Sequence, residues 1–447
     1  MPAGQFSGKV LRTASAFASK PLGASKRWAP ACNCHRLDRS TRHLAQGHRA
    51  PLGPIASASS RRITLAASSA MAQDLGTAPA DSPRIVICGG GIIGCAVAYY
   101  LAKRGTPSTI VERGSIACAS SGKAGGFLAL DWNAGAVGDL AEHSYGLHAD
   151  LARELGAERL GYRTVSTLAV SLSARPSRHK SGSKVPAWID GSVVGSKMMG
   201  DESSTAQVHP EKLTKAFMEE AGKAGAKVHQ GTVTGIKLSH DSTPRVQGVE
   251  VGGEVLPADV VVIAMGPWSK QAADWLPLPP VSGQKAHSVI IQPSSPITSH
   301  CLFTQISGTK SGNAEPELYP RPDGSVYICG ESDSVGVPDD PLSIQPREDA
   351  CDNLEAYAGM VSSALREGAT VKRQACYLPL SPDGTPLIGA VPHVEGAFVA
   401  TGHSCWGILN GPATGACLAD LILDGSCSRV NMKAFSPSRF ASRKARR

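Results

Sequence analysis

A single segment of about thirty residues constrains the fold more than any other part of the chain. The apolar run Arg84–Cys88 leads directly into the glycine-rich segment Gly89–Gly94. Residues Cys95–Arg104 then follow the pattern of a helix, and a second apolar run, Ser108–Val111, ends at Glu112. Strand, glycines, helix, strand and acid in this order are typical of a Rossmann βαβ unit that binds a dinucleotide. An α/β nucleotide-binding domain is therefore expected.

Each residue type in this pattern has a physical role. Gly89 permits the tight turn, Gly91 lets the backbone approach a pyrophosphate, and Gly94 lets the helix pack closely on the strand. The helix N-terminus faces the phosphates, and Glu112 is placed to accept hydrogen bonds from a ribose. This acid disfavours a cofactor with a 2′-phosphate. It does not separate FAD from NAD, so both stay open as cofactors at this point.

Two further strand-to-glycine segments lie far downstream. Val260–Trp268 is a buried strand that closes at Gly266. Gly396–His403 is a strand that runs into a turn, and a helix is expected to start near Gly407. Such segments at opposite ends of a chain indicate one nucleotide-binding fold that a second domain interrupts.

The first 72 residues differ in composition from the rest. Met1–Ala72 contains 11 Lys and Arg and one acid, Asp38, whereas the other 375 residues contain 34 basic and 36 acidic groups. The segment is rich in Ala, Ser and Arg and has no pattern that buries a core, which is typical of an organelle transit peptide without a fixed fold. Its composition favours a plastid over a mitochondrion, and a nucleic-acid-binding arm is the alternative. A second start at Met71 would give a cytosolic form.

The remaining composition excludes several classes of protein. No stretch approaches the ~18 uninterrupted apolar residues of a transmembrane helix, so no stable membrane insertion is expected. Because the net charge of +8 comes from the N-terminal segment, the body carries no nucleic-acid signal. Cys88, Cys95 and the other dispersed cysteines are expected to be free thiols in a reducing compartment. Cys32–His35 has metal-ligand types at too short a spacing, so no metal is expected.

Several ordered motifs together resemble a known family. They are Gly89–Glu112, Ser120–Gly126, Val208–Pro210, Val262–Trp268, Pro382–Gly389 and Gly402–Gly415. Over about residues 83–425 the chain resembles the D-amino-acid oxidase, glycine oxidase and sarcosine oxidase family of FAD-dependent oxidoreductases, and within it a glycine-oxidase-like eukaryotic branch. The resemblance implies an α/β fold: a Rossmann-type FAD-binding domain with an interleaved α+β substrate domain on a mostly antiparallel sheet.

The resemblance also implies domain boundaries. We expect a transit peptide at 1–72, FAD-binding segments at 83–155, 201–275 and 376–428, substrate-domain segments at 156–200 and 276–375, and a basic tail at 429–447.

The residues expected to hold FAD follow from the same resemblance. The loop Ser120–Gly126 would run along the flavin ring, and the helix opening near Gly407 would direct its positive end at the ring's pyrimidine side. Beyond Gly89, Gly91, Gly94 and Glu112, the expected cofactor-binding residues are Ser121, Gly122, Lys123, Ala124, Gly125, Gly126, Gly266, Cys376, Gly402, Gly407 and Ile408.

Cys376 has a more specific implied role. It lies seven residues before Asp383, the spacing at which sarcosine oxidases carry the cysteine that bonds covalently to the flavin. A half-buried thiol at the end of a strand is the alternative.

On the substrate side the chain departs from the family pattern. Glycine oxidases hold the substrate carboxylate with an Arg five residues before the Asp–Gly pair, where this chain has Leu378. A second Arg usually follows the Gly–His pair, where this chain has Ser404–Trp406. Neither Leu nor Trp replaces a bidentate guanidinium. Simple amino-acid oxidation is therefore not the automatic expectation.

Three residues are expected to be catalytic by resemblance. Tyr319 matches a pocket tyrosine of the family, Lys285 lies near the place of an oxygen-activating lysine, and His403 is a candidate for the flavin's edge. Arg321 and Lys285 are candidates for supplying charge to the substrate. Surface or structural roles are the alternative for each of them.

The expected function is FAD-dependent oxidation of the C–N bond of an amine or N-substituted amino acid by hydride transfer to flavin. The partners are this small-molecule substrate and molecular oxygen or another electron acceptor. A flavin-binding regulatory or trafficking protein with vestigial catalysis is the alternative, which the missing arginines favour. An NAD-dependent dehydrogenase would leave Pro382–Gly389 unexplained.

Overall fold

The computed structural model describes residues 82–175, 184–310 and 312–443. The expected transit peptide, the second start at Met71, the Cys32–His35 group and the last residues of the expected basic tail lie outside the described residues. The expectations about them stay predictions.

The nucleotide-binding part is built on a six-stranded sheet. Its spatial order is β19 (Leu387–Ala390), β20 (Ala397–Thr401), β12 (Val260–Ile263), β1 (Ile85–Cys88), β2 (Thr109–Glu112) and β8 (Lys227–Gln230). Neighbouring strands are parallel, except that β19 pairs antiparallel with β20. Strands from three separate regions of the chain thus form one sheet. The expected α/β class with a Rossmann-type sheet is confirmed.

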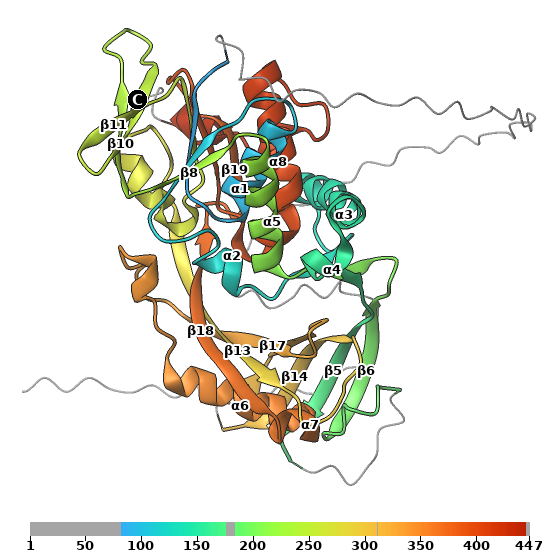
Figure 1. Ribbon diagram of the computed structural model, residues 1–447. Helices are drawn as coiled ribbons and strands as arrows, with labels where there is room; N and C mark the ends of the chain where they lie inside the picture. Colours follow the sequence, from blue (N-terminus) through green and yellow to red (C-terminus); the bar gives the residue numbers. More distant parts are fainter. Residues whose placement is uncertain (1–81, 176–183, 311, 444–447) are drawn as a thin grey trace, which may run out of the picture. The chain divides into compact units, whose positions relative to one another are not determined.

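Both faces of this sheet are covered. Ile85 and Ile87 of β1 pack on one face among the helices α1 (Ile92–Ala102), α5 (Pro210–Lys223) and α8 (Gly407–Asp424), which Figure 1 shows next to one another. Val86 and Cys88 point to the other face, which the antiparallel sheet β9 (Val233–Leu238), β10 (Val246–Val251) and β11 (Glu254–Pro257) covers. Burial on both faces explains why these strands are continuous apolar runs.

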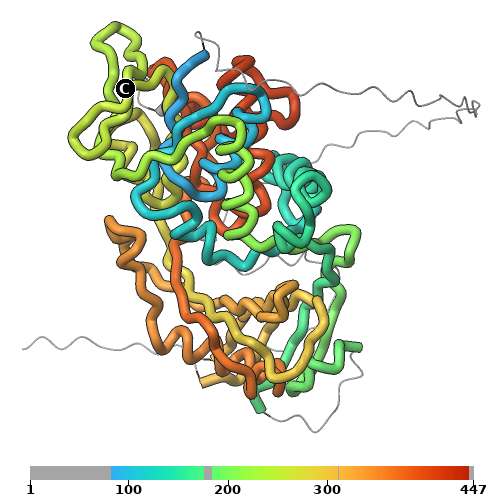
Figure 2. The backbone as a smooth tube through the Cα atoms, in the orientation of Figure 1, coloured from blue at the N-terminus to red at the C-terminus, as the bar shows by residue number. Residues whose placement is uncertain are grey.

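Two glycines let α1 and α8 approach closely. A Cβ on Gly415 would lie 2.6 Å from the Ala96 carbonyl carbon, and one on Gly411 would lie 2.8 Å from a methylene of Ile92. The helices α1 and α8, which are far apart in the sequence, therefore lie side by side, as the blue and red tubes of Figure 2 show. The helix α1 begins at Ile92, earlier than the expected Cys95, because Gly91 is its N-cap.

A proline interrupts the hydrogen-bond ladder of α8, and a side chain of the helix α3 (Gly135–Leu155) supplies the missing donor. Pro412 has no N–H to donate to the Ile408 carbonyl. His148 on α3 donates from Nε2 to the Ile408 oxygen at 3.0 Å and to the Leu409 oxygen at 3.1 Å. Because both acceptors need a proton, the buried His148 ring carries its hydrogen on Nε2. Burial lowers the pKa of His148 to about 4, so the ring is neutral near pH 7.

The second part is built on a larger, mostly antiparallel sheet. In spatial order its strands are β18 (Ala369–Leu380), β13 (Ser282–Gln292), β17 (Val326–Asp333), β16 (Glu317–Pro320), β14 (Cys301–Thr309), β5 (Thr167–Ser173) and β6 (Val193–Gly200), and β15 (Gly312–Ala314) pairs with β14. Only the pair β5–β14 is parallel among these described strands. The mostly antiparallel sheet expected for the second domain is confirmed.

The two faces of the larger sheet differ. One face packs on α6 (Glu348–Val361) and α7 (Ser363–Arg366). The other face carries aromatic side chains and meets the small sheet β3 (Phe127–Ala129), β7 (Thr205–Gln207) and β4 (Arg163–Thr164). Short helical segments complete the fold: α2 (Ser120–Lys123), α4 (Ala157–Leu160), η1 (Gly266–Asp274), η2 (Pro341–Ser343) and η3 (Ser404–Trp406).

The described portion of the expected basic tail packs on the first sheet. It contains η4 (Met432–Ala434) and η5 (Pro437–Arg443). Phe435 is fully buried, and its carbonyl accepts the Ile388 N–H of β19 at 2.9 Å. Arg439 pairs with Asp383 at 2.8 Å. This segment therefore closes the β19 edge.

Two composition-based expectations have structural counterparts. Cys88 and Cys95 are fully buried free thiols, as expected. Among the described residues, none of the helices combines the length and apolar character that crossing a bilayer requires.

Replacing His148 by Leu is expected to destabilise the fold, because the Ile408 and Leu409 carbonyls would lose their donor in a buried site. Leaving a buried acceptor unsatisfied costs about 1–3 kcal/mol. The measurement is the melting temperature at pH 7.5. His240→Leu, on an exposed loop, is the control and is expected to change it little.

The same variant is expected to flatten the pH dependence of stability. The folded-state pKa of His148, about 4, lies below the ordinary value of 6.5, so the unfolded chain takes up the proton first as the pH falls. The contribution of this histidine to the free energy of unfolding is therefore fully present above pH 6.5 and is lost as the pH falls toward 4. The loss is about 2 kcal/mol at pH 5. Equal losses in wild type and His148→Leu between pH 7.5 and 5 would contradict this reading.

Candidate functional site

The glycine turn after β1 leaves no room for side chains at two positions. Gly89 has φ of +112°, and a Cβ on Gly94 would lie 2.0 Å from the Gly89 oxygen. At Gly91 an added Cβ would meet, among the described residues, only the Ser121 hydroxyl, at 3.1 Å. The turn therefore presents bare backbone at the start of α1, as a pyrophosphate site requires.

Glu112 closes this turn from the end of β2. One carboxylate oxygen accepts the N–H of Gly90 at 2.7 Å, and the other accepts the N–H of Gly114 at 2.7 Å. The carboxylate is thereby fixed beside the glycines, where Rossmann sites bind a ribose.

The segment Ser120–Gly126, here called the flavin loop, connects the turn with the larger sheet. Ser121 Oγ accepts the N–H of Ile92, the first residue of α1, at 2.8 Å. Gly122 packs on the Ala117 oxygen, and Gly126, with φ of +85°, packs on the Val208 oxygen. Close backbone contacts thus fix both ends of the loop.

The flavin loop covers the outer edge of β18. Ser120 Oγ donates to the Tyr377 oxygen at 2.7 Å, and Lys123 Nζ donates to the Ala375 oxygen at 3.1 Å. In return, the Gln374 amide donates to the Lys123 oxygen at 3.0 Å. These bonds satisfy carbonyls that an edge strand would otherwise leave unpaired, and they tie the loop to the second domain.

The loop also lies directly on the aromatic face of the larger sheet. A Cβ on Gly125 would be 2.5 Å from the Tyr319 ring and 2.9 Å from the Tyr327 ring. The buried Arg321 donates to the Ala124 oxygen at 3.1 Å, and its guanidinium lies 5.2 Å from the centre of the Tyr327 ring. Tyr319 and Arg321, both expected near the substrate, therefore contact the flavin loop.

The start of α8 forms the other side of the site. Gly266 (φ +54°) opens η1, and Gly402 (φ +79°) follows β20. The helix begins at Gly407, where the sequence places its start, with the buried Ile408 next to it. His403, 3% exposed, shares a hydrogen bond between Nε2 and Thr414 Oγ1 at 3.0 Å. Burial lowers the pKa of His403 to about 3, so it is neutral near pH 7.

The structure separates Lys285 from the other expected site residues. On β13, Ala286 pairs with Cys376 and Lys285 pairs with Tyr377. Because successive strand residues point to opposite faces, Cys376 lies on the face that the flavin loop covers, and Lys285 lies on the other. There Lys285 is near Asp333. Burial opposes ionisation of the Asp333 carboxyl, but His287, Arg347 and Lys285 together lower its pKa.

Sequence reasoning missed one titratable residue of the site, Glu317. On β16 it lies two residues before Tyr319 and so on the same face. The Tyr319 hydroxyl donates to Glu317 Oε2 at 2.5 Å, and burial raises the pKa of this carboxyl. Side chains along Glu317–Pro320 alternate between the two faces of the sheet. The sequence of this short strand does not show which face points inward, so Glu317 could not be identified as a site residue from the sequence alone.

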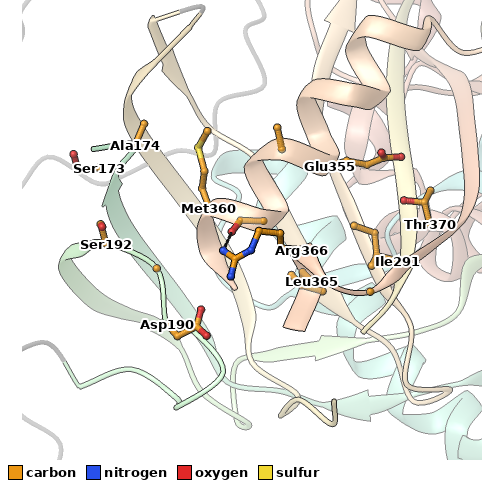
Figure 3. Close-up of a pocket in the computed structure, with 14 residues that line it drawn as sticks. Ser173, Ala174, Asp190, Ser192, Ile291, Glu355, Met360, Leu365, Arg366 and Thr370 are labelled. Carbon is orange, nitrogen blue, oxygen red and sulfur yellow. Dashed lines mark hydrogen bonds between the residues drawn. The ribbon is translucent and has the colours of Figure 1, made fainter. Parts of the chain in front are cut away.

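A separate cavity of about 560 Å³ lies on the α6–α7 side of the larger sheet. Figure 3 shows Asp190, Glu355 and Arg366 at its wall, with the hydrogen bond from Arg366 to the Gly359 carbonyl. Glu355 pairs with Arg373 at 2.8 Å, and Asp190 accepts the Ser363 N–H at 2.8 Å. Its acidic groups are thus engaged within the fold, and it lies on the face opposite Tyr319.

The residues of the site fit FAD. The turn at Gly91 admits a pyrophosphate, and Glu112 stands beside it. At the other end, α8 has no side-chain N-cap, and the buried Nδ1 of His403 has no partner among the described residues. Such groups are normally satisfied by a ligand or water.

Gly125→Ala is expected to displace the flavin loop, because the new methyl would meet two rings that are themselves packed. Overpacking of this kind costs about 1–3 kcal/mol, and we expect FAD to be bound about tenfold or more weakly. The measurement is flavin content and affinity of the purified protein. Gly146→Ala, where the methyl meets nothing within 4 Å, is the control. Full flavin content in Gly125→Ala would contradict the placement of the loop.

Comparison with known proteins agrees with this geometry. The family model DAO, described as FAD dependent oxidoreductase, matches residues 84–421. The Schizosaccharomyces pombe protein C1F5.03c, which carries the name of an oxidoreductase, is 32% identical over 80% of this chain and 98% of its own. A Pseudomonas aeruginosa glycine oxidase is 27% identical over 76% of this chain and 95% of its own.

A solved structure shows the same fold. The Geobacillus kaustophilus glycine oxidase matches with a TM-score of 0.66 and 24% identity over 80% of this chain and 99% of that chain. Since the family model spans most of the described fold, this chain belongs to the DAO family of FAD-dependent oxidoreductases.

Proposed function

We propose that the protein oxidises the C–N bond of an amine or N-substituted amino acid, with molecular oxygen as electron acceptor. The observation that carries the proposal is the flavin loop, which joins the dinucleotide turn to the aromatic face of the second domain through Gly125. A cofactor held by the first domain would thereby meet a substrate held by the second. The names of relatives, which include glycine oxidase and iminodiacetate oxidase, support the same reaction class.

The chain's residues divide the work of this reaction. The backbone at Gly91 and the N-terminus of α1 would hold the pyrophosphate, and Glu112 would hold the ribose. The N-terminus of α8, at Gly407, would stabilise negative charge. Neutral His403 offers Nδ1 as a hydrogen-bonding group at this end. FAD, when bound, supplies the acceptor for the hydride.

The overall chemistry balances without a further cofactor. The C–N single bond loses two electrons and two protons to become an imine, and water hydrolyses the imine to a carbonyl compound and an amine. Molecular oxygen takes up the two electrons and two protons as hydrogen peroxide. The hydride leaves from the neutral amine, so a substrate that binds as an ammonium ion first loses one proton to a group of the site or to water.

Substrate selection differs from a carboxylate clamp built of two arginines. Leu378 lies on β18 opposite Gln284 of β13, and Ser404–Trp406 form the turn before α8. Neither place offers a guanidinium. The buried Arg321 is held by the flavin loop through Ala124.

Purified protein with FAD bound is expected to consume oxygen and release an equal amount of hydrogen peroxide when given primary or secondary amines. The measurement is oxygen uptake and peroxide yield across a panel of amines and amino acids. The matched control is Gly125→Ala, expected to lose activity together with its flavin. If the flavin is fully bound and chemically reducible but no amine or amino acid drives oxygen uptake, the regulatory alternative replaces this proposal.

We also propose that Cys376 attaches FAD covalently. Burial raises the pKa of its thiol to about 11, while the positive Lys123 and the Ser120 hydroxyl, both in the flavin loop, lower it. Replacing an S–H and a C–H bond by one S–C bond releases two electrons and two protons, which molecular oxygen takes up as hydrogen peroxide.

Acid precipitation tests the attachment. Wild-type protein is expected to keep its yellow colour in the precipitate, and Cys376→Ser is expected to release it to the supernatant. Cys88→Ser, another buried thiol, is the control and should behave as wild type. Colour released from the wild type would refute attachment without affecting the proposed reaction.

A further inference from the structure

Glu317 is a carboxylate without a counter-ion on the face that meets the flavin loop. Its Oε2 accepts from the Tyr319 hydroxyl at 2.5 Å and lies 3.6 Å from the Cys329 sulfur. Neither group is a cation, and within the described residues no ion pair includes Glu317. Burying a carboxylate without a cation is costly. This cost is reflected in the raised pKa of the Glu317 carboxyl, and a positively charged ligand beside the carboxylate would offset it.

The carboxylate is open on one side. Glu317 is partly exposed, although its strand neighbours Leu318 and Tyr319 are buried. No donor among the described residues lies on Glu317 Oε1. This oxygen is therefore available to a ligand.

Aromatic rings gather around Tyr319, the hydrogen-bond partner of Glu317, and Phe303 is the residue that pairs with Glu317 across β14 and β16. Tyr319 stacks on Tyr327 at 6.0 Å between ring centres and on Phe127 at 5.5 Å. Phe303 lies 5.9 Å from Tyr319 and 5.0 Å from Trp132. Ring faces attract an ammonium group electrostatically, most strongly where water is excluded. A carboxylate among several rings is therefore a binding site for an organic cation.

Two members of this cluster adjoin the proposed cofactor elements. Its half-buried members include Trp132 and Trp406, while Phe127, Phe303 and Tyr319 are buried. Trp406 is the N-cap of α8, and Tyr319 contacts Gly125 of the flavin loop. A cation bound here would lie between the two elements that hold the cofactor.

The cations on this face are engaged elsewhere. Arg163 donates to the Pro320 oxygen at 2.6 Å, Arg321 to the Ala124 oxygen at 3.1 Å, and Lys123 to the Ala375 oxygen at 3.1 Å. Each holds the main chain instead of neutralising Glu317.

We propose that Glu317, with the rings of Phe127, Trp132, Phe303 and Tyr319, binds the ammonium group of the substrate. The substrate is then selected by its positive charge, in place of the carboxylate that two arginines select in glycine oxidases. This inference rests on the proposed oxidation of an amine and specifies its substrate class: amines that do not need a carboxylate.

The test compares choline with 3,3-dimethyl-1-butanol, its uncharged isostere, on the purified protein with FAD bound. Binding is followed by tryptophan fluorescence and by the flavin absorption spectrum. Wild type is expected to bind choline at least about tenfold more tightly than the isostere. Glu317→Gln keeps the size and an acceptor for Tyr319, and is expected to bring the ratio close to one. Glu315→Gln, the same change at an exposed neighbour, should leave it unchanged.

Three outcomes would overturn the inference. They are equal binding of choline and its isostere by the wild type, a ratio that survives Glu317→Gln, and tighter binding of acetate than of choline. The comparison of choline with its isostere on the wild type tests the inference even if Glu317→Gln does not fold. A protein without flavin would contradict the proposed function, whereas the fluorescence comparison would still test Glu317.

Discussion

The contact between Gly125 and the rings of Tyr319 and Tyr327 is the constraint on which the site depends. It places the flavin loop against the aromatic face of the larger sheet, while Ser121 holds the loop's other end on the first residue of α1. Only a residue without a side chain allows this approach. The glycine turn and the aromatic face of the larger sheet are thereby joined through one short segment.

A second constraint lies at α8, whose N-terminus forms the far end of the site. Pro412 removes a hydrogen bond from the ladder of this helix, and His148 and Ser144 of α3 satisfy the groups left without partners. The distance from Gly407 to the glycine turn is held by close packing of Gly415 on Ala96. The hydrogen bonds from α3 and the close packing of glycine thus fix the positions of the N-termini of α1 and α8.

Local patterns made much of this predictable. The order of strand, glycines and helix at Gly89–Gly94, and the helix start at Gly407, depend on neighbours in sequence and agree with the structure. Which side chains share a face of a sheet depends on the register between strands, and the pattern of a single strand does not contain that register. Lys285 is one residue from the partner of Cys376 and therefore points away from it. Glu317 escaped notice for the same reason, because β16 has four residues and its inward face is set by β14 and β17.

The central claim is that this fold holds FAD where an amine can reduce it. The direct measurement is the visible spectrum of the purified protein mixed with an amine in the absence of oxygen. We expect the absorption of oxidised flavin to be present at first, to bleach on mixing with an amine that lacks a carboxylate, and to return when air is admitted. A protein that is colourless after incubation with FAD, or a bound flavin that dithionite bleaches and no amine does, would contradict the account.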